Sequence, residues 1–248
     1  MPASLVFWTV SRIPAPKRHE ASLALLDLSL VLLVFRLFGR VGLYGLIVFN
    51  LVICNIQVLK TIHLFGLTTT LGNILYASIF LSTDLLSEFY GKKEAQRGVL
   101  LGFCCLILAT LYMQIALQFA PGPNDFAQPH LAAIFDFMPR VALGSMAAYL
   151  LSQWHDVWAF HAIRAKTGER WLWLRNNAST LVSQLIDSSV FCVIAFWGVF
   201  PFSVWLEILL TTYLIKALTA GLDTPFIYLA KRLQLAPQTQ TATQGEAR

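Results

Sequence analysis

The sequence predicts an all-α integral membrane protein, built as a bundle of six to seven transmembrane helices. Hydrophobic residues make up 57% of the 248 residues and charged residues only 12%, and the mean hydropathy is +0.65. A surface exposed to water cannot tolerate this composition, so lipid must be the solvent of most side chains. Because a transmembrane helix needs about 20 apolar residues, six or seven spans would use nearly the whole chain and leave no room for a soluble domain.

Seven apolar runs follow one another along the chain, and we expect each to form a helix. They cover residues 22–38, 41–60, 65–88, 98–120, 138–160, 177–199 and 203–230. The first run is short and contains Asp27 and Arg36, which leaves its crossing of the membrane open. Glycine and proline mark the breaks: Gly91 should end the third run, residues 121–125 separate the fourth from the fifth, and Pro201 precedes the last.

Residues 22–232 are therefore expected to form the transmembrane domain, with a tail at each end. In the N-terminal tail 1–21, charged residues and prolines follow a short apolar patch where a signal peptide would need small residues, so we expect no cleavable signal. The C-terminal tail 233–248 is rich in Gln and Thr, and is predicted to be disordered.

The distribution of the 18 Lys and Arg residues predicts the orientation. Most of them lie in the loops after the first, third and fifth runs and at the C-terminus, which would put these segments in the cytoplasm. The basic N-terminal tail disagrees, since seven spans would put it outside; a first run that fails to span would put it inside. The net charge of +5 follows from these clusters, and we expect no binding of nucleic acid.

Two charged residues lie near the middle of apolar runs. Asp187 falls in the sixth run and Lys216 in the seventh, where a lone charge costs about 2.5 to 3.5 kcal/mol. Helical spacing puts each of them in a polar stripe, and Gln184 belongs to the stripe of Asp187. We expect Asp187 and Lys216 to meet, or to line one cavity. The alternative is an ion pair that only holds the two helices together.

The third and fifth runs carry polar stripes of the same kind. Asn73, Phe80 and Asp84 share one side of the third, and Tyr149 and neighbouring Ser residues share a face of the fifth. Taken singly, Asn73 and Gln184 are typical of hydrogen bonds between helices, and Asp84 of a solvated helix end. Four converging stripes instead favour a polar interior that a solute can enter.

The sequence leaves open the relation of one further cation, Arg140, to the polar interior, and it contains no motif of an enzyme or a metal site. Arg140 lies at the outer end of the fifth run on a different face from its acids, so it reaches either the membrane interface or the cavity. We find no nucleophile and base pair, no metal-ligand spacing and no phosphate-binding loop, so we expect no enzyme, no metal and no cofactor.

Seven short segments follow one another in a specific order on four of the predicted helices. They are Gly-Leu-Thr-Thr-Thr-Leu-Gly-Asn-Ile-Leu-Tyr at 66–76, Ser-Thr-Asp at 82–84, Glu-Phe-Tyr-Gly-Lys-Lys-Glu-Ala at 88–95, Pro-Arg-Val-Ala at 139–142, Gln-Trp-His-Asp-Val-Trp at 153–158, Asn-Asn-Ala-Ser-Thr at 176–180 and Gln-Leu-Ile-Asp at 184–187. In these segments the chain resembles the queuosine precursor transporters, also called the vitamin uptake transporter family. The resemblance covers nearly everything from about residue 40 to 230.

The resemblance implies uptake of 7-deazaguanine bases, in the 7-cyano or 7-aminomethyl form, across a bacterial inner or plasma membrane. A carboxylate can accept the paired N–H groups of such a base, a cation or amide can bind its carbonyl, and aromatic rings can stack on its face. The substrate-binding residues we expect are Asn73, Phe80, Asp84, Gln184, Asp187, Lys216 and Arg140. The expected partners are the lipid bilayer, this nucleobase-like solute and, as an open alternative to a monomer, a second copy of the chain.

The sequence is also compatible with other classes of transport protein. The chain could be the substrate-binding membrane component of an energy-coupling-factor importer with a separate ATPase, or a facilitator of another small polar heterocycle. Energy could come from protons carried by Asp187, or secondarily by Asp84. Facilitated diffusion followed by metabolic trapping is the rival.

Overall fold

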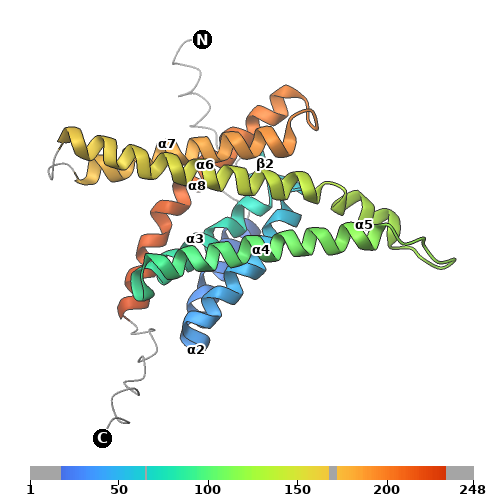
Figure 1. Ribbon diagram of the computed structural model, residues 1–248, viewed down its shortest axis with the longest axis horizontal. Coiled ribbons are helices and arrows are strands. Elements are labelled where there is room, and N and C mark those ends of the chain that lie inside the picture. The colour runs from blue at the N-terminus through green and yellow to red at the C-terminus, as the bar shows by residue number, and fades with distance from the viewer. Residues whose placement is uncertain (1–17, 65, 168–171, 233–248) are drawn as a thin grey trace, which may run out of the picture.

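The computed structural model describes residues 18–64, 66–167 and 172–232, which form seven α-helices and one β-hairpin (Figure 1). The predicted tails lie almost wholly outside these residues. The helices are α2 (Arg18–Gln57), α3 (Gly72–Tyr90), α4 (Lys92–Leu117), α5 (Gln128–Phe135), α6 (Met138–Thr167), α7 (Leu172–Phe196) and α8 (Phe202–Arg232). The strands are β1 (Thr61–Leu64) and β2 (Leu67–Thr70).

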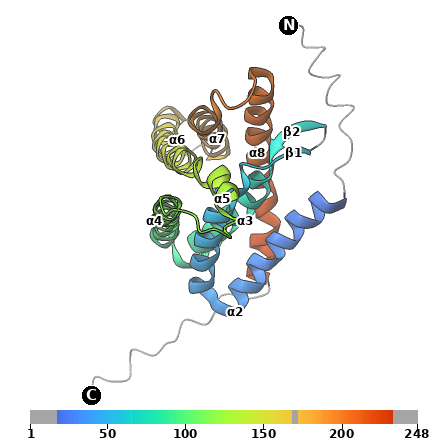
Figure 2. The ribbon, with the colours of Figure 1, turned by 90° about the vertical axis from the view of Figure 1, so that its right-hand side faces the viewer.

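The helices form a bundle with an apolar outer surface. Helices α4, α6 and α7 run along the longest axis in Figure 1 and are seen end-on in Figure 2. Among the described residues, the stretches Leu25–Gln57, Lys92–Leu117 and Gln128–Ile163 are long and apolar enough to cross a membrane. Exposed leucines such as Leu108 and Leu150 cover the outside, as lipid contact requires. The predicted all-α, multi-pass membrane fold is confirmed.

Helix α2 consists of two arms that meet at Gly39. This glycine has φ 57° and ψ −135°, a conformation that is costly for residues with a Cβ. The first arm, residues 18–38, and the second arm, residues 40–57, correspond to the first two predicted runs. Both pack on α3: Phe35 of the first arm and Ile47 of the second share one apolar cluster with Leu81.

The predicted helix 65–88 is wrong at its start, because residues 67–70 form a strand that pairs antiparallel with residues 61–64, with Thr61 opposite Thr70. The cause is local: β-branched residues favour strands, and Gly66 supplies the positive φ of 81° at the turn. The hairpin lies beside α8 in Figure 2. The Thr68 N–H donates to Glu207 Oε2 at 3.2 Å, and the Thr211 hydroxyl donates to the Thr68 carbonyl at 3.0 Å.

Two other boundaries also differ from expectation. Helix α4 begins at Lys92 and not near 98, because the basic segment that follows Gly91 continues the helix beyond the apolar run. Within it, Arg97 pairs with Glu94 at 2.5 Å. The segment between the fourth and fifth runs contains the short helix α5, whose apolar residues are too few to register as a span.

The close approach of α2 and α3 at Gly72 yields the first prediction. A methyl group at this position would lie less than 3.0 Å from the Cys54 carbonyl oxygen and from the Val58 side chain. We expect Gly72→Ala to destabilise the folded protein by about 1–3 kcal/mol through overpacking. The measurement is thermal unfolding in detergent, followed by tryptophan fluorescence. Gly45→Ala is the matched control, since no atom lies within 4 Å of its added Cβ; equal midpoints for both variants would contradict the packing.

Candidate functional site

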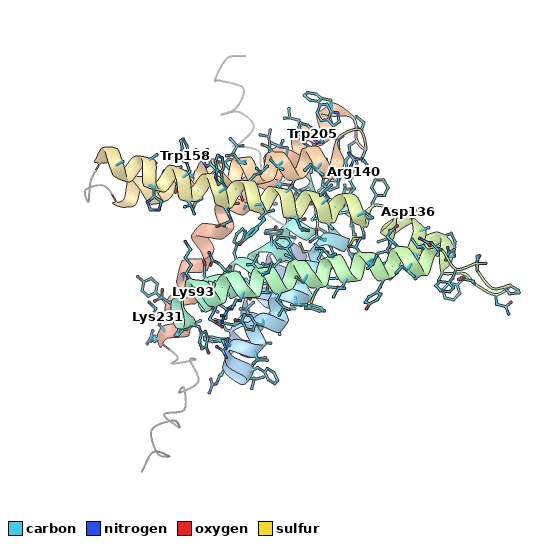
Figure 3. The ribbon with its side chains drawn as sticks, in the orientation of Figure 1. Lys93, Asp136, Arg140, Trp158, Trp205 and Lys231 are labelled. Atoms are coloured by element: carbon cyan, nitrogen blue, oxygen red, sulfur yellow. The ribbon has the colours of Figure 1, made fainter. Side chains whose placement is uncertain are left out.

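A cavity of about 380 Å³ lies among α2, α3, α4, α6 and α7. At its deep end is Asp187, which is 8% exposed. At the other end lie Ser87, Lys92 and Gln96, all of them exposed. The cavity therefore opens at the end of the bundle where α3 passes into α4, which is the end marked by Lys93 in Figure 3.

The deep end of the cavity is formed by a buried ion pair. The Lys216 ammonium, on α8, donates to Asp187 Oδ2 on α7, and Lys216 is 3% exposed. The Ser152 hydroxyl lies 3.5 Å from the other carboxylate oxygen, and Lys216 Nζ lies 4.4 Å from the centroid of the Tyr76 ring. The predicted meeting of Asp187 and Lys216 is confirmed. Their attraction and these contacts compensate two charges that would each be costly alone.

Two aromatic pairs form the walls of the cavity. Tyr76 and Phe80, both on α3, have ring centroids 5.4 Å apart. Phe103 of α4 and Tyr149 of α6 have centroids 5.2 Å apart. All four rings line the cavity. Aromatic faces attract flat, polarisable ligands by stacking, so the walls suit a planar heterocycle better than a flexible solute.

Polar groups without partners of their own also face this space. The Gln184 Oε1 atom is buried and accepts no hydrogen bond within the described residues. Asp84 lines the same cavity, and no ion pair involves it in the described part of the chain. A buried amide oxygen without a donor is costly. The cavity therefore offers acceptors to a ligand that carries N–H groups.

A much smaller pocket, of about 10 Å³, lies on the far side of the ion pair. Asn73 lines it and donates to Thr69 at 3.1 Å and to Thr212 at 2.9 Å. Ser145 of α6 donates to Asn55 of α2 at 2.6 Å. These buried bonds join helices on the hairpin side of the bundle. The large cavity is thus open toward the α3–α4 connection and closed toward the hairpin.

The expected site residues lie in three places. Phe80, Asp84, Gln184 and Asp187 line the large cavity, and Lys216 contacts it through its pair with Asp187. Asn73 lies in the closed layer. Arg140 lies away from both: its guanidinium donates to the carbonyls of Ile194 and Trp197, each at 2.5 Å, and so caps the end of α7. Figure 3 shows Arg140 at the opposite end of the molecule from Lys93 and Lys231.

Sequence reasoning missed the contribution of α4. Lys92, Gln96, Val99 and Phe103 all line the cavity, and their spacing of four, three and four residues places them on one helical face. In the sequence Lys92 belongs to the basic residues that indicate orientation, and a single Phe and a single Gln do not make a polar stripe. The periodicity of these four residues was the available signal.

Comparison with known proteins gives consistent matches. A family model described as "Putative vitamin uptake transporter" matches residues 70–230. The Bacillus subtilis protein named "Probable queuosine precursor transporter" is 47% identical over 85% of this chain and 92% of its own length. The Escherichia coli "Queuosine precursor transporter" is 34% identical over 71% of this chain and 80% of its own. No solved structure matches the chain.

The buried pair yields the second prediction. Asp187→Leu or Lys216→Met leaves one uncompensated buried charge, so each should destabilise the protein by about 3–5 kcal/mol. The double variant removes both charges, and should be more stable than either single variant. Thermal unfolding of the four proteins in detergent makes the comparison. A double variant at least as unstable as the worse single variant would show that the two charges do not compensate each other.

Proposed function

Because the chain belongs to the queuosine precursor transporters, also called the vitamin uptake transporter family, we propose that it imports 7-deazaguanine precursors of queuosine. It is a membrane transporter and not an enzyme. The proposed cargo is the 7-cyano or the 7-aminomethyl base, taken up across a bacterial inner or plasma membrane. The observation that carries this proposal is the cavity itself, with two aromatic pairs above a buried ion pair.

The chemistry of the cavity matches the chemistry of such a base. Its ring would stack between the pair Tyr76 and Phe80 and the pair Phe103 and Tyr149, with about 1–3 kcal/mol per stacked base. Its N–H and amino groups would donate to a carboxylate, Asp84 or Asp187, and to the unpartnered oxygen of Gln184. Its carbonyl oxygen would accept from Lys216.

Two of the seven expected residues take indirect roles in this proposal. Asn73 holds α3 to α8 through Thr212, and so keeps the hairpin side closed beneath the base. Arg140 fixes the end of α7, which positions Asp187 through the helix and without contact to the cargo.

We infer that the cavity faces the cytoplasm. Lys93 and Lys231 lie at the same end of the bundle in Figure 3, beside the exposed rim residues Lys92 and Gln96. By the positive-inside rule this end, and with it the C-terminus, is cytoplasmic. The described conformation is then the one from which an imported base is released, and uptake would require the hairpin side to open while this side closes.

The third prediction concerns activity in cells. A bacterial strain that can neither make nor import the precursor should regain queuosine in its tRNA when this chain is expressed and the base is supplied. Mass spectrometry of tRNA nucleosides measures the outcome. Absence of queuosine with every supplied precursor, in cells whose membranes contain the protein, would refute the proposed cargo. Uptake by the purified chain in liposomes without added ATPase subunits would exclude the energy-coupling-factor alternative.

The fourth prediction concerns the aromatic walls. Tyr149→Leu removes one stacking face, so the dissociation constant of the base should rise about tenfold. Tyr149→Phe keeps the ring and should stay close to the original protein, because no hydrogen bond of the Tyr149 hydroxyl enters the proposal. Binding of labelled base to the purified variants measures both constants. Equal affinities for the Leu and Phe variants would contradict stacking at this wall.

A further inference from the structure

A second buried polar cluster lies between the two arms of α2 and α3, away from the cavity. Its members are Asp27 on the first arm, Asn50 on the second arm, and Ser78 and Ser82 on α3. Asn50 is 3% exposed and both serines 0%. The Asn50 amide donates to the Ser78 hydroxyl at 2.7 Å, and that hydroxyl donates to the Leu75 carbonyl at 2.8 Å and lies next to the Asp27 carboxylate. Three helical segments thus bring polar groups to one place.

All three segments present these residues at the same depth. Asp27 precedes the kink at Gly39 by 12 residues, Asn50 follows it by 11, and Ser78 precedes the break at Gly91 by 13. At 1.5 Å per residue these separations are about 16–20 Å, roughly the middle of a bilayer about 30 Å thick. The carboxyl group of Asp27 is therefore an intramembrane acid.

No cation neutralises Asp27 within the described residues. Of the charged groups on the packed helices, Arg40 and Arg97 pair with Glu94, and Lys231 pairs with Glu88; Tyr44 donates to Glu94. Lys216 is bound to Asp187, and Asp84 lines the cavity on the other side of α3. Arg36 is exposed, nine residues further along the first arm. Within the described residues, the Asp27 carboxylate therefore has polar neighbours but no ion-pair partner.

The cluster also holds oxygen atoms that lack donors. Asp27 Oδ2 and Ser82 Oγ are both buried, and neither has a hydrogen-bond partner in the described part of the chain. With the Asn50 amide oxygen and Ser78 Oγ, they make a set of one carboxylate, one amide and two hydroxyls. Oxygen donors with a single negative charge suit a small, hard monovalent cation. A cluster that served only to join helices would need neither the carboxylate nor the unpartnered oxygens.

We propose that Asp27, Asn50, Ser78 and Ser82 bind the monovalent cation, H⁺ or Na⁺, whose gradient drives uptake of the base. This inference rests on the proposed function. Asp187 is poorly suited to the same task, because Lys216 already neutralises it and would compete with any cation. The negative charge of the Asp27 carboxylate would be compensated by the driving ion itself, and intramembrane acids commonly carry protons or ions in transporters in this way.

Helix α3 links the proposed cation site to the cavity. Ser78 and Ser82 lie on the face opposite Tyr76, Phe80 and Asp84, because the angular step of 100° per residue separates the two groups by roughly half a turn. One rigid helix thus carries ligands for both sites. Binding of the cation would fix α3 against the arms of α2, and so favour one position of the cavity wall over the other.

The test uses the full chain in liposomes and labelled 7-cyano-7-deazaguanine. One experiment imposes a pH gradient at equal Na⁺ concentration on both sides, and a second imposes a Na⁺ gradient at equal pH. The original protein should concentrate the base inside the liposomes above the outside level in one of the two experiments. Asp27→Asn should abolish this accumulation and still exchange labelled for unlabelled base at equilibrium. Asp136→Asn, an exposed acid next to α5, is the matched control and should accumulate the base normally.

Each other outcome overturns the proposal. Accumulation by Asp27→Asn would exclude Asp27 as the cation ligand, and equilibration unaffected by either gradient would exclude coupling. If Asp27→Asn also lost exchange, Asp27 would be required for folding or for binding of the base, and not for coupling to the cation. If the original protein exchanges no base, the proposed cargo is wrong, and thermal unfolding without any base then tests cation binding. The unfolding midpoint of the original protein should shift with the Na⁺ concentration or with pH, and Asp27→Asn should remove that shift. The same dependence in both proteins would overturn the cation site.

Discussion

The absence of water in the bilayer core is the constraint on which the structure depends, because every charge placed there needs a partner inside the protein. The pair between Asp187 and Lys216 is the main response to it. It joins α7 to α8, and further contacts attach α6 through Ser152 and α3 through Tyr76. The position of the cavity follows, since its deep end lies where these four helices are held together.

Helix α8 connects the ion pair to the closed side of the bundle. Glu207 and Thr211 bind the backbone of the hairpin, Thr212 binds Asn73, and Lys216 binds Asp187. These four residues lie within three turns of one helix. A movement of α8 would therefore disturb the hairpin contact, the closed layer and the floor of the cavity together. A base that competes for Asp187 or Lys216 would act on all three, which is how occupancy of the cavity can be linked to opening of the opposite side.

The parts of the fold that follow from hydrophobic periodicity and from the cost of buried charge could be predicted from the sequence. The division of α2 into two apolar runs, the pairing of Asp187 with Lys216 and the polar face of α3 belong to this class. The hairpin could not be predicted as easily, because its second strand, residues 67–70, falls inside the predicted run 65–88, and only its β-branched residues and Gly66 distinguish it from a helix. The cavity wall on α4 depends on how helices pack, which single residues such as Phe103 do not reveal. Arg140 satisfies the carbonyls of α7, a contact that helical spacing alone cannot identify.

A cryo-electron microscopy structure of the protein with bound 7-cyano-7-deazaguanine tests most directly whether the cavity above the Asp187 and Lys216 pair is the transport site. We expect density for the flat base between the Tyr76 and Tyr149 walls, with its polar edge at Gln184 and the ion pair. Density for the base elsewhere, with this cavity empty and the pair undisturbed, would contradict the account.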